Sequence, residues 1–380
     1  MRIGLVAGET SGDLLGAGLI QELRELSPDI QFEGVAGPAM QSAGCVAWES
    51  SEALAVMGII EPLREIPRLL RLRRELIGRW TKTPPDVFVG IDAPDFNLGL
   101  ETRLRKQGIC TAHYGSPSLW AWRQGRVRKI AKAVDMVLCL LPFEKAFYER
   151  HQVTAEFVGH PMADAIPDDL DAARYRSALG IEADRVVAVL PGSRMSEVTR
   201  LGPIFAAACA QLAATDSGLR FVAPMVSDRI RRLFEAHLNS AGMESRFTLT
   251  DGDAESAIAA ADVVLLASGT AALQAALLCR PMVAAYRLAA LSGVIVKTFR
   301  LLKSPYVTLP NMLTQEPLVP EFLQGAATPG VLAEAVSGLL NDAGKRAQIV
   351  EQFSKLRLEL ARGADKMAAQ VIFDLARGRR

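Results

Sequence analysis

A run of five apolar residues, 263–267, leads directly into Ser268, Gly269 and Thr270. This order is typical of a buried strand, a tight turn and a helix start, where free backbone N–H groups and the helix dipole bind anions. The segment between Asp262 and Glu316 contains no acidic residue. Its basic residues are Arg280, Arg287, Lys297, Arg300 and Lys303. The pattern predicts a diphosphate site, although an ordinary strand–helix unit shares part of it.

A second turn of this kind follows the expected strand 186–190. It contains Gly192, Ser193, Arg194 and, one helical turn later, Glu197. An Arg after a Gly-Ser turn can hold a phosphate with paired donors. Parallel strands end at one edge of their sheet, so we expect Arg194 near Ser268–Thr270. Two neighbouring anion sites suit a diphosphate better than a carboxylate.

Carboxylates follow two strands of the first half of the chain. Asp92 directly continues the apolar strand 87–91, and Asp95 and Asn97 come shortly after it. A carboxylate at such a strand end stands where a general base is needed. A capped surface turn would explain Asp95 equally well, but it explains Asp92 less well.

The first strand, 3–7, ends in a glycine-containing turn. The turn reads Gly8, Glu9, Thr10, Ser11, Gly12 and Asp13. The glycines let the backbone approach a ligand closely, and we expect the hydroxyl and carboxylate side chains to cap the following helix. The turn lacks the GxGxxG pattern, so it does not indicate a nicotinamide cofactor.

An aromatic turn follows the fourth strand, 111–114. It contains Ser116, Trp120, Trp122 and Arg123. A rigid aromatic turn can form the wall of a sugar or acyl pocket. The alternative is that the two Trp residues only pack against the edge of a domain.

Short apolar strands alternate with helical patterns along the chain. The expected strands are 3–7, 32–36, 87–91, 111–114, 134–140, 186–190, 220–223, 263–267 and 282–286. This alternation predicts an α/β protein with parallel sheets covered by helices. Periodicity breaks between Gly159 and Asp169, which predicts two Rossmann-like domains facing a cleft, 1–162 and 168–341. The helical tail, 342–380, packs back on the first domain or onto another subunit.

Composition excludes several classes of protein. The net charge is only +1, so a nucleic-acid partner has no electrostatic support. The five cysteines are scattered without zinc-ligand spacing, which predicts no metal site and a reducing, cytoplasmic compartment. No apolar run approaches the roughly 20 residues that span a bilayer.

Residues 63–82 combine leucines with arginines and end near Trp80. Such a basic amphipathic helix suits an anionic membrane surface. Segment 287–303 is a second candidate of the same kind. For either segment the alternative is an ordinary helix with its leucines in the core and its arginines in solvent.

Taken together, these residues resemble the lipid-A-disaccharide synthase family. The matching strings are Ala7–Glu9, Ser11–Asp13, Gly90–Asp92, Pro94–Asn97, Ser116–Ser118, Trp120–Arg123, Leu141–Glu144, Phe157–Pro161, Leu190–Arg194 with Glu197, Ala267–Ala271 and Leu309–Asn311. They occur in family order and cover residues 1 to about 325. The ordered set is far more specific than any single string.

The resemblance implies a GT-B fold, with acceptor binding in the first domain and UDP-sugar binding in the second. It implies an inverting glycosyltransferase that joins UDP-2,3-diacylglucosamine to 2,3-diacylglucosamine 1-phosphate. The products are the β-1,6-linked lipid A disaccharide 1-phosphate and UDP. It implies no cofactor, and a peripheral place on the cytoplasmic face of the Gram-negative inner membrane. It also implies a homodimer that exchanges C-terminal segments.

Asp92 is the expected base, Glu9 and Asp95 are the reserves, and Glu9 alternatively orients the acceptor. The acceptor side is completed by Ser11, Gly12, Asp95, Asn97, Ser116, Trp120, Trp122 and Arg123. The UDP side is formed by Gly192, Ser193, Arg194, Glu197, Ser268, Gly269, Thr270, Gln274 and Asn311. Gln274 stands where the family usually has a Glu that holds the ribose, and an amide bonds more weakly than a carboxylate.

Two other functions share parts of this pattern. One is another GT-B enzyme of UDP-sugars, such as a lipid-linked N-acetylglucosaminyltransferase or an epimerase. The other is a non-catalytic, membrane-associated nucleotide-sugar binder, against which the carboxylates Asp92 and Glu9 argue.

Overall fold

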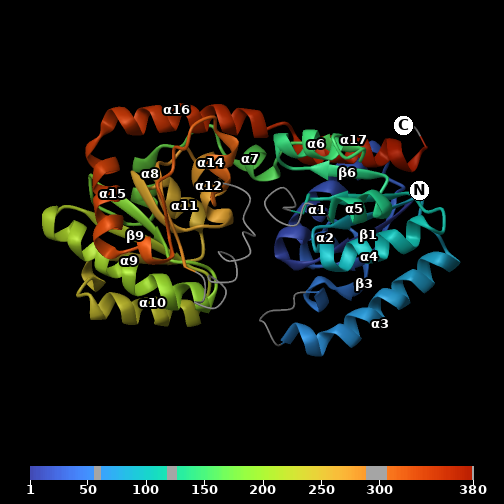
Figure 1. The fold of residues 1–380 in the computed structure, drawn as a ribbon, viewed down its shortest axis with the longest axis horizontal. Coiled ribbons are helices and arrows are strands. Elements are labelled where there is room, and N and C mark those ends of the chain that lie inside the picture. The colour runs from blue at the N-terminus through green and yellow to red at the C-terminus, as the bar shows by residue number, and fades with distance from the viewer. Residues whose placement is uncertain (55–60, 118–125, 288–305, 379–380) are drawn as a thin grey trace. The chain divides into compact units, whose positions relative to one another are not determined.

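The computed structural model describes residues 1–54, 61–117, 126–287 and 306–378 (Figure 1). The chain divides into two compact units. The N-terminal unit consists of Met1–Asp164 and Leu360–Arg380, and the C-terminal unit of Ala165–Glu359. Each unit has one parallel sheet with helices packed on it.

The sheet of the N-terminal unit has seven strands in the order β3-β2-β1-β4-β5-β6-β7. Their bounds are β1 Arg2–Ala7, β2 Gln31–Ala36, β3 Cys45–Ser50, β4 Val87–Ile91, β5 Thr111–Tyr114, β6 Met136–Cys139 and β7 Ala155–Phe157. All described pairings are parallel. The strand order reverses between β1 and β4, and ligands of such sheets bind at the carboxyl end of this switch point.

Helices cover both faces of this sheet. They are α1 Glu9–Leu26, α2 Pro38–Ser42, α3 Glu61–Lys82, α4 Pro94–Arg105, α5 Val127–Ala133, α6 Pro142–Glu149, α7 Pro161–Ala165 and, from the end of the chain, α17 Ala364–Ala376. One core packs α1, α2 and α17 against alternate strand residues such as Leu5. The opposite core packs α3 and α4 against the intervening residues, such as Val6. The alternation along β1 therefore builds a three-layer unit.

The sheet of the C-terminal unit has six strands in the order β10-β9-β8-β11-β12-β13. Their bounds are β8 Val186–Leu190, β9 Arg220–Met225, β10 Phe247–Asp251, β11 Val263–Ala267, β12 Met282–Tyr286 and β13 Glu321–Leu323. The switch point lies between β8 and β11, both of which are wholly buried. Its carboxyl edge carries the turns at 191–194 and 268–270.

Six of the eight described helices of the C-terminal unit form two contacting sets. The eight are α8 Ala172–Ala178, α9 Met195–Thr215, α10 Asp228–Ser240, α11 Ala254–Ala259, α12 Thr270–Leu277, α14 Leu309–Leu313, α15 Pro329–Asn341 and α16 Ala343–Leu360. The set of α9, α10 and α15 packs together, and α12 contacts α11 and α14. Right-handed crossovers place the two sets on opposite faces of the sheet.

The last helix, α17, belongs to the N-terminal unit and packs on α1 (Figure 1). Asp164 caps its start by accepting hydrogen bonds from the N–H groups of Gly363 and Ala364, at 2.9 and 2.7 Å. Gly18 on α1 leaves room for the carboxylate of Asp365. Within 342–378, the helix α16 thus packs largely with the second unit and α17 with the first.

Four strands of the structure were not expected from the sequence: β3, β7, β10 and β13. They are the four edge strands of the two sheets. β3, β10 and β13 are partly exposed, and β7 and β13 have only three residues each. They therefore lack the continuous apolar run that marks a strand buried on both faces.

His160 gives the N-terminal unit a testable pH dependence. Its Nδ1 accepts a hydrogen bond from the N–H of Met162 at 3.2 Å. Burial lowers the pKa of His160 to about 4, from 6.5. The unfolded chain therefore binds the extra proton first, and stability should fall as the pH drops from about 6.5 to 4, by roughly 3 kcal/mol at most.

The measurement is chemical denaturation of the wild-type protein and of His160→Gln between these pH values. The variant should show a flatter dependence than the wild type. The difference between the two curves removes other groups, such as Asp365, whose pKa burial raises to about 6. Parallel curves would contradict the assignment.

Candidate active site

The turn after β1 and the turn after β4 contact each other at the switch point of the N-terminal unit. A Cβ atom at Gly8 would lie 2.7 Å from the Cβ of Ala93. Glu9, Asp92 and Ala93 all have left-handed backbones, with φ of 59°, 49° and 43°. Non-glycine residues in this conformation store strain and concentrate at functional sites. The structure thus brings Glu9 and Asp92, the two expected catalytic carboxylates, to neighbouring turns.

Backbone hydrogen bonds hold the Asp92 turn in place. The N–H of Asp92 donates to the carbonyl of Tyr114 at 2.9 Å. The side-chain amide of Asn97 donates to the carbonyls of Val6, Ile91 and Asp92, at 3.1, 3.3 and 2.8 Å. Asn97 is fully buried, so its amide ties the ends of β1 and β4 together. Its expected contact with the acceptor stays a prediction.

Other residues expected on the acceptor side have mixed surroundings. Asp95 is exposed and pairs with Arg126 at 3.1 Å, whereas the Ser116 hydroxyl lies 2.9 Å from the hydroxyl of Tyr148. Ser11 is exposed, and Gly12 is buried beside Asp92. Trp120, Trp122 and Arg123 lie outside the described residues.

The expected capping of α1 is wrong. Gly8 is its N-cap, and no side chain caps the helix. The buried carboxylate of Asp13 instead accepts hydrogen bonds from the N–H groups of Gly37, Ala39 and Met40, at 2.8, 2.8 and 3.1 Å. Asp13 therefore caps α2, a contact that local sequence order does not indicate.

The turn after β8 is closed by its own glutamate. The Glu197 carboxylate accepts hydrogen bonds from the N–H groups of Ser193 and Arg194, at 3.1 and 3.3 Å. A Cβ at Gly192, where φ is 125°, would lie 2.6 Å from Glu197. Glu197 therefore fixes the shape of this turn and accepts the hydrogen bonds that its N–H groups can donate. The Arg194 side chain is 77% exposed and only weakly paired with Glu197, at 3.4 Å, so it is free to turn toward a ligand.

The start of α12 is open by contrast. Gly269 is its N-cap, with no side-chain hydrogen bond to the helix, and Gly269 and Thr270 are exposed. Ser268 donates weakly to the carbonyl of Val307, at 3.4 Å. Gln274 lies one turn further on and is partly buried. Uncapped N–H groups at the positive end of a helix dipole form an anion site.

Several polar residues of the C-terminal unit are occupied by backbone groups. Asn311 is buried, donates to the carbonyl of Val319 and to Glu321, and accepts from the N–H groups of Leu318 and Val319, each at 2.8 Å. Its side chain thus clamps a loop. The guanidinium groups of Arg280 and Arg287 donate to main-chain carbonyls. These two arginines are therefore engaged with the main chain, which the charge pattern of the sequence did not indicate; Lys297, Arg300 and Lys303 lie outside the described residues.

The amphipathic helix α3 turns part of its apolar stripe inward. Trp80 is fully buried, packs edge-on against Phe88 with ring centroids 5.0 Å apart, and donates from Nε1 to Glu33 at 3.3 Å. Leu76 is 2% exposed, and Leu69 and Leu72 pack on the same core. Trp80 is therefore a core residue, and its predicted place at a membrane interface is wrong. The second candidate segment lies outside the described residues apart from Arg287.

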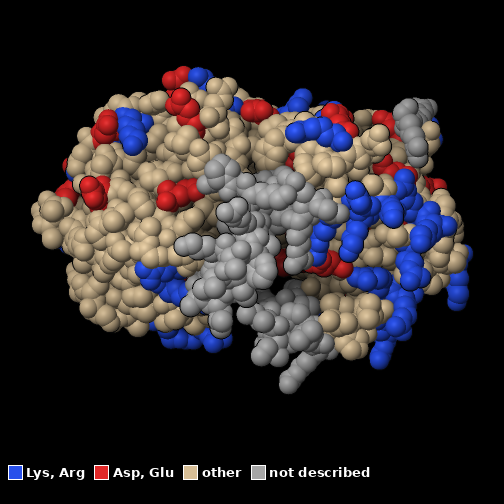
Figure 2. Space-filling model, viewed as in Figure 1, with Lys and Arg blue, Asp and Glu red and all other residues tan. Residues whose placement is uncertain are grey.

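A basic surface spans α3, α4 and α5 (Figure 2). Its exposed cations are Arg71, Arg74, Arg103, Lys106, Arg128, Lys129 and Lys132. A hollow of about 570 Å³ between α3 and α4 is lined by Leu70, Arg73, Arg74, Ile77, Gly99, Thr102 and Arg103. Ile66 and Leu70, 44% and 40% exposed, add apolar surface.

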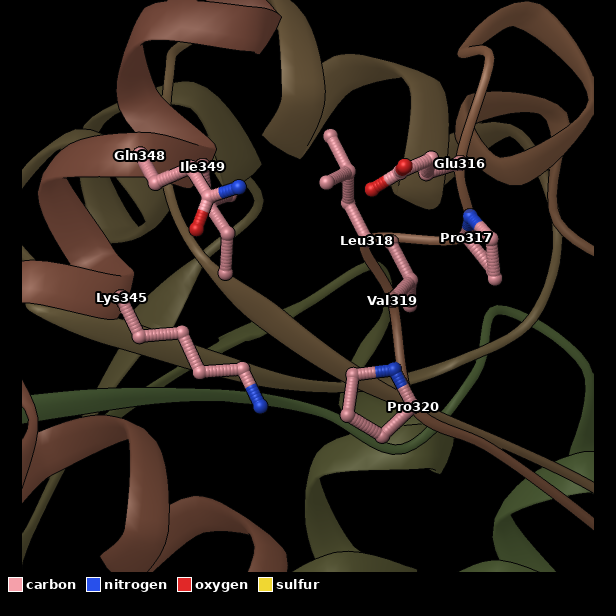
Figure 3. A pocket seen from close by; sticks show the side chains of 8 residues that line it. All are labelled: Glu316, Pro317, Leu318, Val319, Pro320, Lys345, Gln348 and Ile349. Carbon is pink, nitrogen blue, oxygen red and sulfur yellow. The ribbon is translucent and has the colours of Figure 1, made fainter.

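A pocket of about 380 Å³ lies on the flank of the C-terminal unit (Figure 3). It is formed by the segment 316–320, which leads into β13, and by Lys345, Gln348 and Ile349 of α16. None of the residues expected to bind UDP lines it. The described residues contain no group of three His, Cys, Asp or Glu arranged for a metal. They also contain no helix long and apolar enough to cross a membrane.

Solved structures with the same architecture define the fold class of this protein. A glycosyltransferase of kitacinnamycin superposes with a TM-score of 0.64 at 16% identity, covering 98% of both chains. A putative UDP-N-acetylglucosamine 2-epimerase from Listeria monocytogenes superposes with a TM-score of 0.63 at 13% identity, covering 98% of this chain and 94% of the other. The fold is GT-B, with two Rossmann-like units.

The chain belongs to the lipid-A-disaccharide synthetase family, whose profile matches residues 3–373. It is 50% identical over 381 aligned positions to the lipid-A-disaccharide synthase of Alkalilimnicola ehrlichii, covering 100% of this chain and 99% of the relative. It is 49% identical to that of Pseudomonas aeruginosa with the same coverage. The family resemblance in the motifs is confirmed, and the chain is a glycosyltransferase.

Proposed function

We propose that the chain transfers the sugar of UDP-2,3-diacylglucosamine to the 6-hydroxyl of 2,3-diacylglucosamine 1-phosphate. The products are the β-1,6-linked disaccharide 1-phosphate and UDP. Full-length similarity to lipid-A-disaccharide synthases supports the substrates. The observation that carries the chemistry is the pair of strained turns that bring Glu9 and Asp92 together at one switch point.

Asp92 is the general base of this proposal. Its carboxylate takes the proton of the acceptor hydroxyl while that oxygen attacks the anomeric carbon from the face opposite the diphosphate. The bond from the anomeric carbon to the diphosphate oxygen breaks, and its electron pair leaves with UDP, so the centre inverts. Glu9 orients the acceptor or replaces Asp92 as base, and exposed Asp95 is the second reserve base.

The C-terminal unit would receive the donor. Negative charge grows on the departing diphosphate, and preorganised donors that meet it lower the barrier. The open start of α12 and the exposed guanidinium of Arg194 are such donors. Gln274 would hydrogen-bond the ribose. Glu197 and Asn311 contribute by fixing the loops around the donor.

The basic surface over α3, α4 and α5 would lie on an anionic membrane, at the cytoplasmic face of the inner membrane. Both substrates carry acyl chains, and Ile66 and Leu70 offer apolar contacts beside the cations. Each surface Lys or Arg near anionic lipid contributes about 1 kcal/mol at low salt.

A homodimer that exchanges C-terminal segments would keep the contact between α1 and α17, with α17 supplied by a second copy. Light scattering of the purified protein tests this proposal. A mass that corresponds to a single chain at micromolar concentration would rule it out.

The first prediction concerns the base. Asp92→Asn removes a proton acceptor with little change in volume, so UDP affinity should persist while kcat falls at least about 10²-fold. Turnover is measured by mass spectrometry of the disaccharide product, and UDP affinity by calorimetry. Asp29→Asn, at an exposed carboxylate just before β2, is the matched control and should keep near-normal kcat. Near-normal turnover of the Asp92 variant would move the base assignment to Glu9.

The second prediction concerns the donor site. Arg194→Ala removes a charge-assisted contact worth about 1.5–3 kcal/mol, so UDP should bind roughly 10- to 150-fold more weakly. Arg232→Ala, an exposed arginine on α10, is the control. Calorimetry that gives the same UDP affinity for both variants and the wild type would place Arg194 outside the donor site.

The third prediction concerns the membrane surface. Ile66→Ser combined with Leu70→Ser should weaken sedimentation with phosphatidylglycerol vesicles and leave the melting temperature nearly unchanged, because both side chains are exposed. Leu358→Ser, a 75% exposed leucine on α16, should alter neither. Leu76→Ser should lower the melting temperature strongly, since a buried leucine is worth several kcal/mol. Unweakened sedimentation of the folded double variant would contradict membrane contact through this face.

A further inference from the structure

A second hollow of the N-terminal unit lies between α4 and α5, and the proposed reaction does not yet use it. It measures about 320 Å³ and shares Gly99 and Thr102 with the hollow between α3 and α4. Three cations of the α5 segment line it: Arg126, Lys129 and Lys132. The hollow therefore forms a recess in the basic surface (Figure 2).

The cations line the hollow because they share one side of α5. Arg126, Lys129 and Lys132 are each three residues apart, which is close to one helical turn. The opposite side of α5 packs into the core through Val127 and Ile130. Side chains three residues apart are neighbours on a helix, and like charges at such positions repel one another. Folding alone gives no reason for this stripe of cations, whereas the binding of an anion in the hollow does.

The charge of the lining matches a phosphomonoester. Among the described residues that line the hollow, Asp95 is the one carboxylate, and its Oδ1 lies 3.1 Å from Nη1 of Arg126. Lys129 and Lys132 are exposed and form no ion pair with any described residue. Three cations and one carboxylate leave this lining with a net charge of +2. A phosphomonoester carries about −1.5 to −2 at pH 7, and the phosphodiester of a lipid headgroup carries less.

The hollow begins close to the proposed base. Pro94 lines it and stands two residues after Asp92, so their Cα atoms are no more than about 7.6 Å apart. The Asn97 side chain donates to the carbonyl of Asp92 at 2.8 Å, and the Asn97 N–H donates to the carbonyl of Ala93 at 3.0 Å. These bonds fasten the Asp92 turn to the first turn of α4. The base and the near end of the hollow therefore keep a fixed separation.

Arg73 adds a further positive charge from the other side of α4. Its guanidinium donates to the carbonyl of Asp95 at 3.0 Å and lies over the ring of Phe96, 4.9 Å from the centroid. A Cβ atom at Gly99 would lie 2.8 Å from Nη1 of Arg73, so the glycine admits the arginine against the helix. Positive charge is therefore concentrated around the first turn of α4, at the end of the hollow nearest to Asp92.

We propose that the hollow between α4 and α5 binds the 1-phosphate of the acceptor sugar, and that Arg126, Lys129 and Lys132 select a phosphorylated acceptor. The proposal rests on the proposed function, with Asp92 as base. The attacking 6-hydroxyl and the 1-phosphate belong to one sugar ring. A phosphate held in the hollow thus keeps the hydroxyl within the width of that ring, at the end where Asp92 lies. The three cations bind the acceptor and take no part in proton transfer.

The direct test uses glucosamine 1-phosphate, the water-soluble acceptor head without acyl chains, titrated with the full-length protein and followed by phosphorus NMR. Arg126→Gln combined with Lys129→Gln should bind this probe at least about tenfold more weakly than the wild type, because charge-assisted contacts are lost. Lys366→Gln, at an exposed lysine of α17, is the control and should bind it like the wild type. Equal affinity of the double variant and the wild type would overturn the proposal.

The kinetic test compares two acceptors in neutral-detergent micelles, where no anionic lipid is present. They are 2,3-diacylglucosamine 1-phosphate and the same molecule without its phosphate. The wild type should prefer the phosphorylated acceptor, as measured by the ratio of the two kcat/KM values. The double variant should lose at least about tenfold in kcat/KM with the phosphorylated acceptor and change little with the other. Its UDP affinity should match that of the wild type.

Two outcomes would assign the cations to another role and refute the proposal. Equal losses with both acceptors, together with a lower melting temperature, would make the cations structural. An unchanged preference in micelles, together with weaker sedimentation on phosphatidylglycerol vesicles, would mean that they serve the membrane surface only. Should the double variant not fold, Lys129→Gln alone decides the question, because that side chain is exposed.

Failure of this proposal and failure of the proposed function have different signatures. A wild-type protein that forms no disaccharide, but binds glucosamine 1-phosphate through Arg126 and Lys129, would refute the transfer reaction and keep the phosphate site. A wild-type protein that forms disaccharide equally well from both acceptors would keep the transfer reaction and refute the selection of a phosphorylated acceptor.

Discussion

The structure depends on how the unpaired backbone groups at the carboxyl ends of its parallel strands are satisfied. Buried polar groups cost free energy unless they are hydrogen-bonded, so each strand end needs a partner. In the N-terminal unit the Asn97 amide serves the carbonyls at the ends of β1 and β4. In the C-terminal unit Glu197 and Asn311 serve the N–H groups of neighbouring turns.

These side-chain hydrogen bonds explain which backbone and side-chain groups remain available to a ligand. At the switch point of the C-terminal unit, the start of α9 is filled by Glu197, whereas the start of α12 has no side-chain cap. At the switch point of the N-terminal unit, the N–H and carbonyl groups of Asp92 are hydrogen-bonded, and its carboxylate remains for the proposed reaction. In the proposed reaction each unit would thus supply one kind of chemistry: carboxylates in the first, and a helix dipole with the exposed guanidinium of Arg194 in the second.

The helix α3 shows how one amphipathic pattern can serve two surroundings. Its positions Leu76 and Trp80 close the core over Phe88, while Ile66 and Leu70 remain at the surface among arginines. The apolar stripe of α3 is wider than its contact with the core requires. The apolar residues that remain exposed are available for contact with a lipid surface. The distinction between these leucines depends on rotation about the helix axis and on the neighbouring α4.

The sequence predicts the central strands, the glycine turns and the order of the motifs. Strands buried on both faces appear as continuous apolar runs. Tight turns favour particular residues, glycine above all. The edge strands β3, β7, β10 and β13 could not be predicted, since partly exposed or very short strands lack that signal. The fold could therefore be predicted from local sequence patterns, except for the edge strands of the two sheets.

The candidate site likewise has a part that the sequence predicts and a part that it does not. Asp92, Glu9 and the start of α12 stand where strand order alone places them. Burial and contacts with groups distant in the sequence determine the structural roles of Asn97, Asn311, Asp13 and Trp80. Residue type alone does not reveal these contacts. The ion pair of Asp95 and Arg126 beside the hollow between α4 and α5 has no sequence signal at all, because two helices meet there only through packing. Local sequence determines which chemical groups are present, and tertiary packing decides which of them are left unpaired to react.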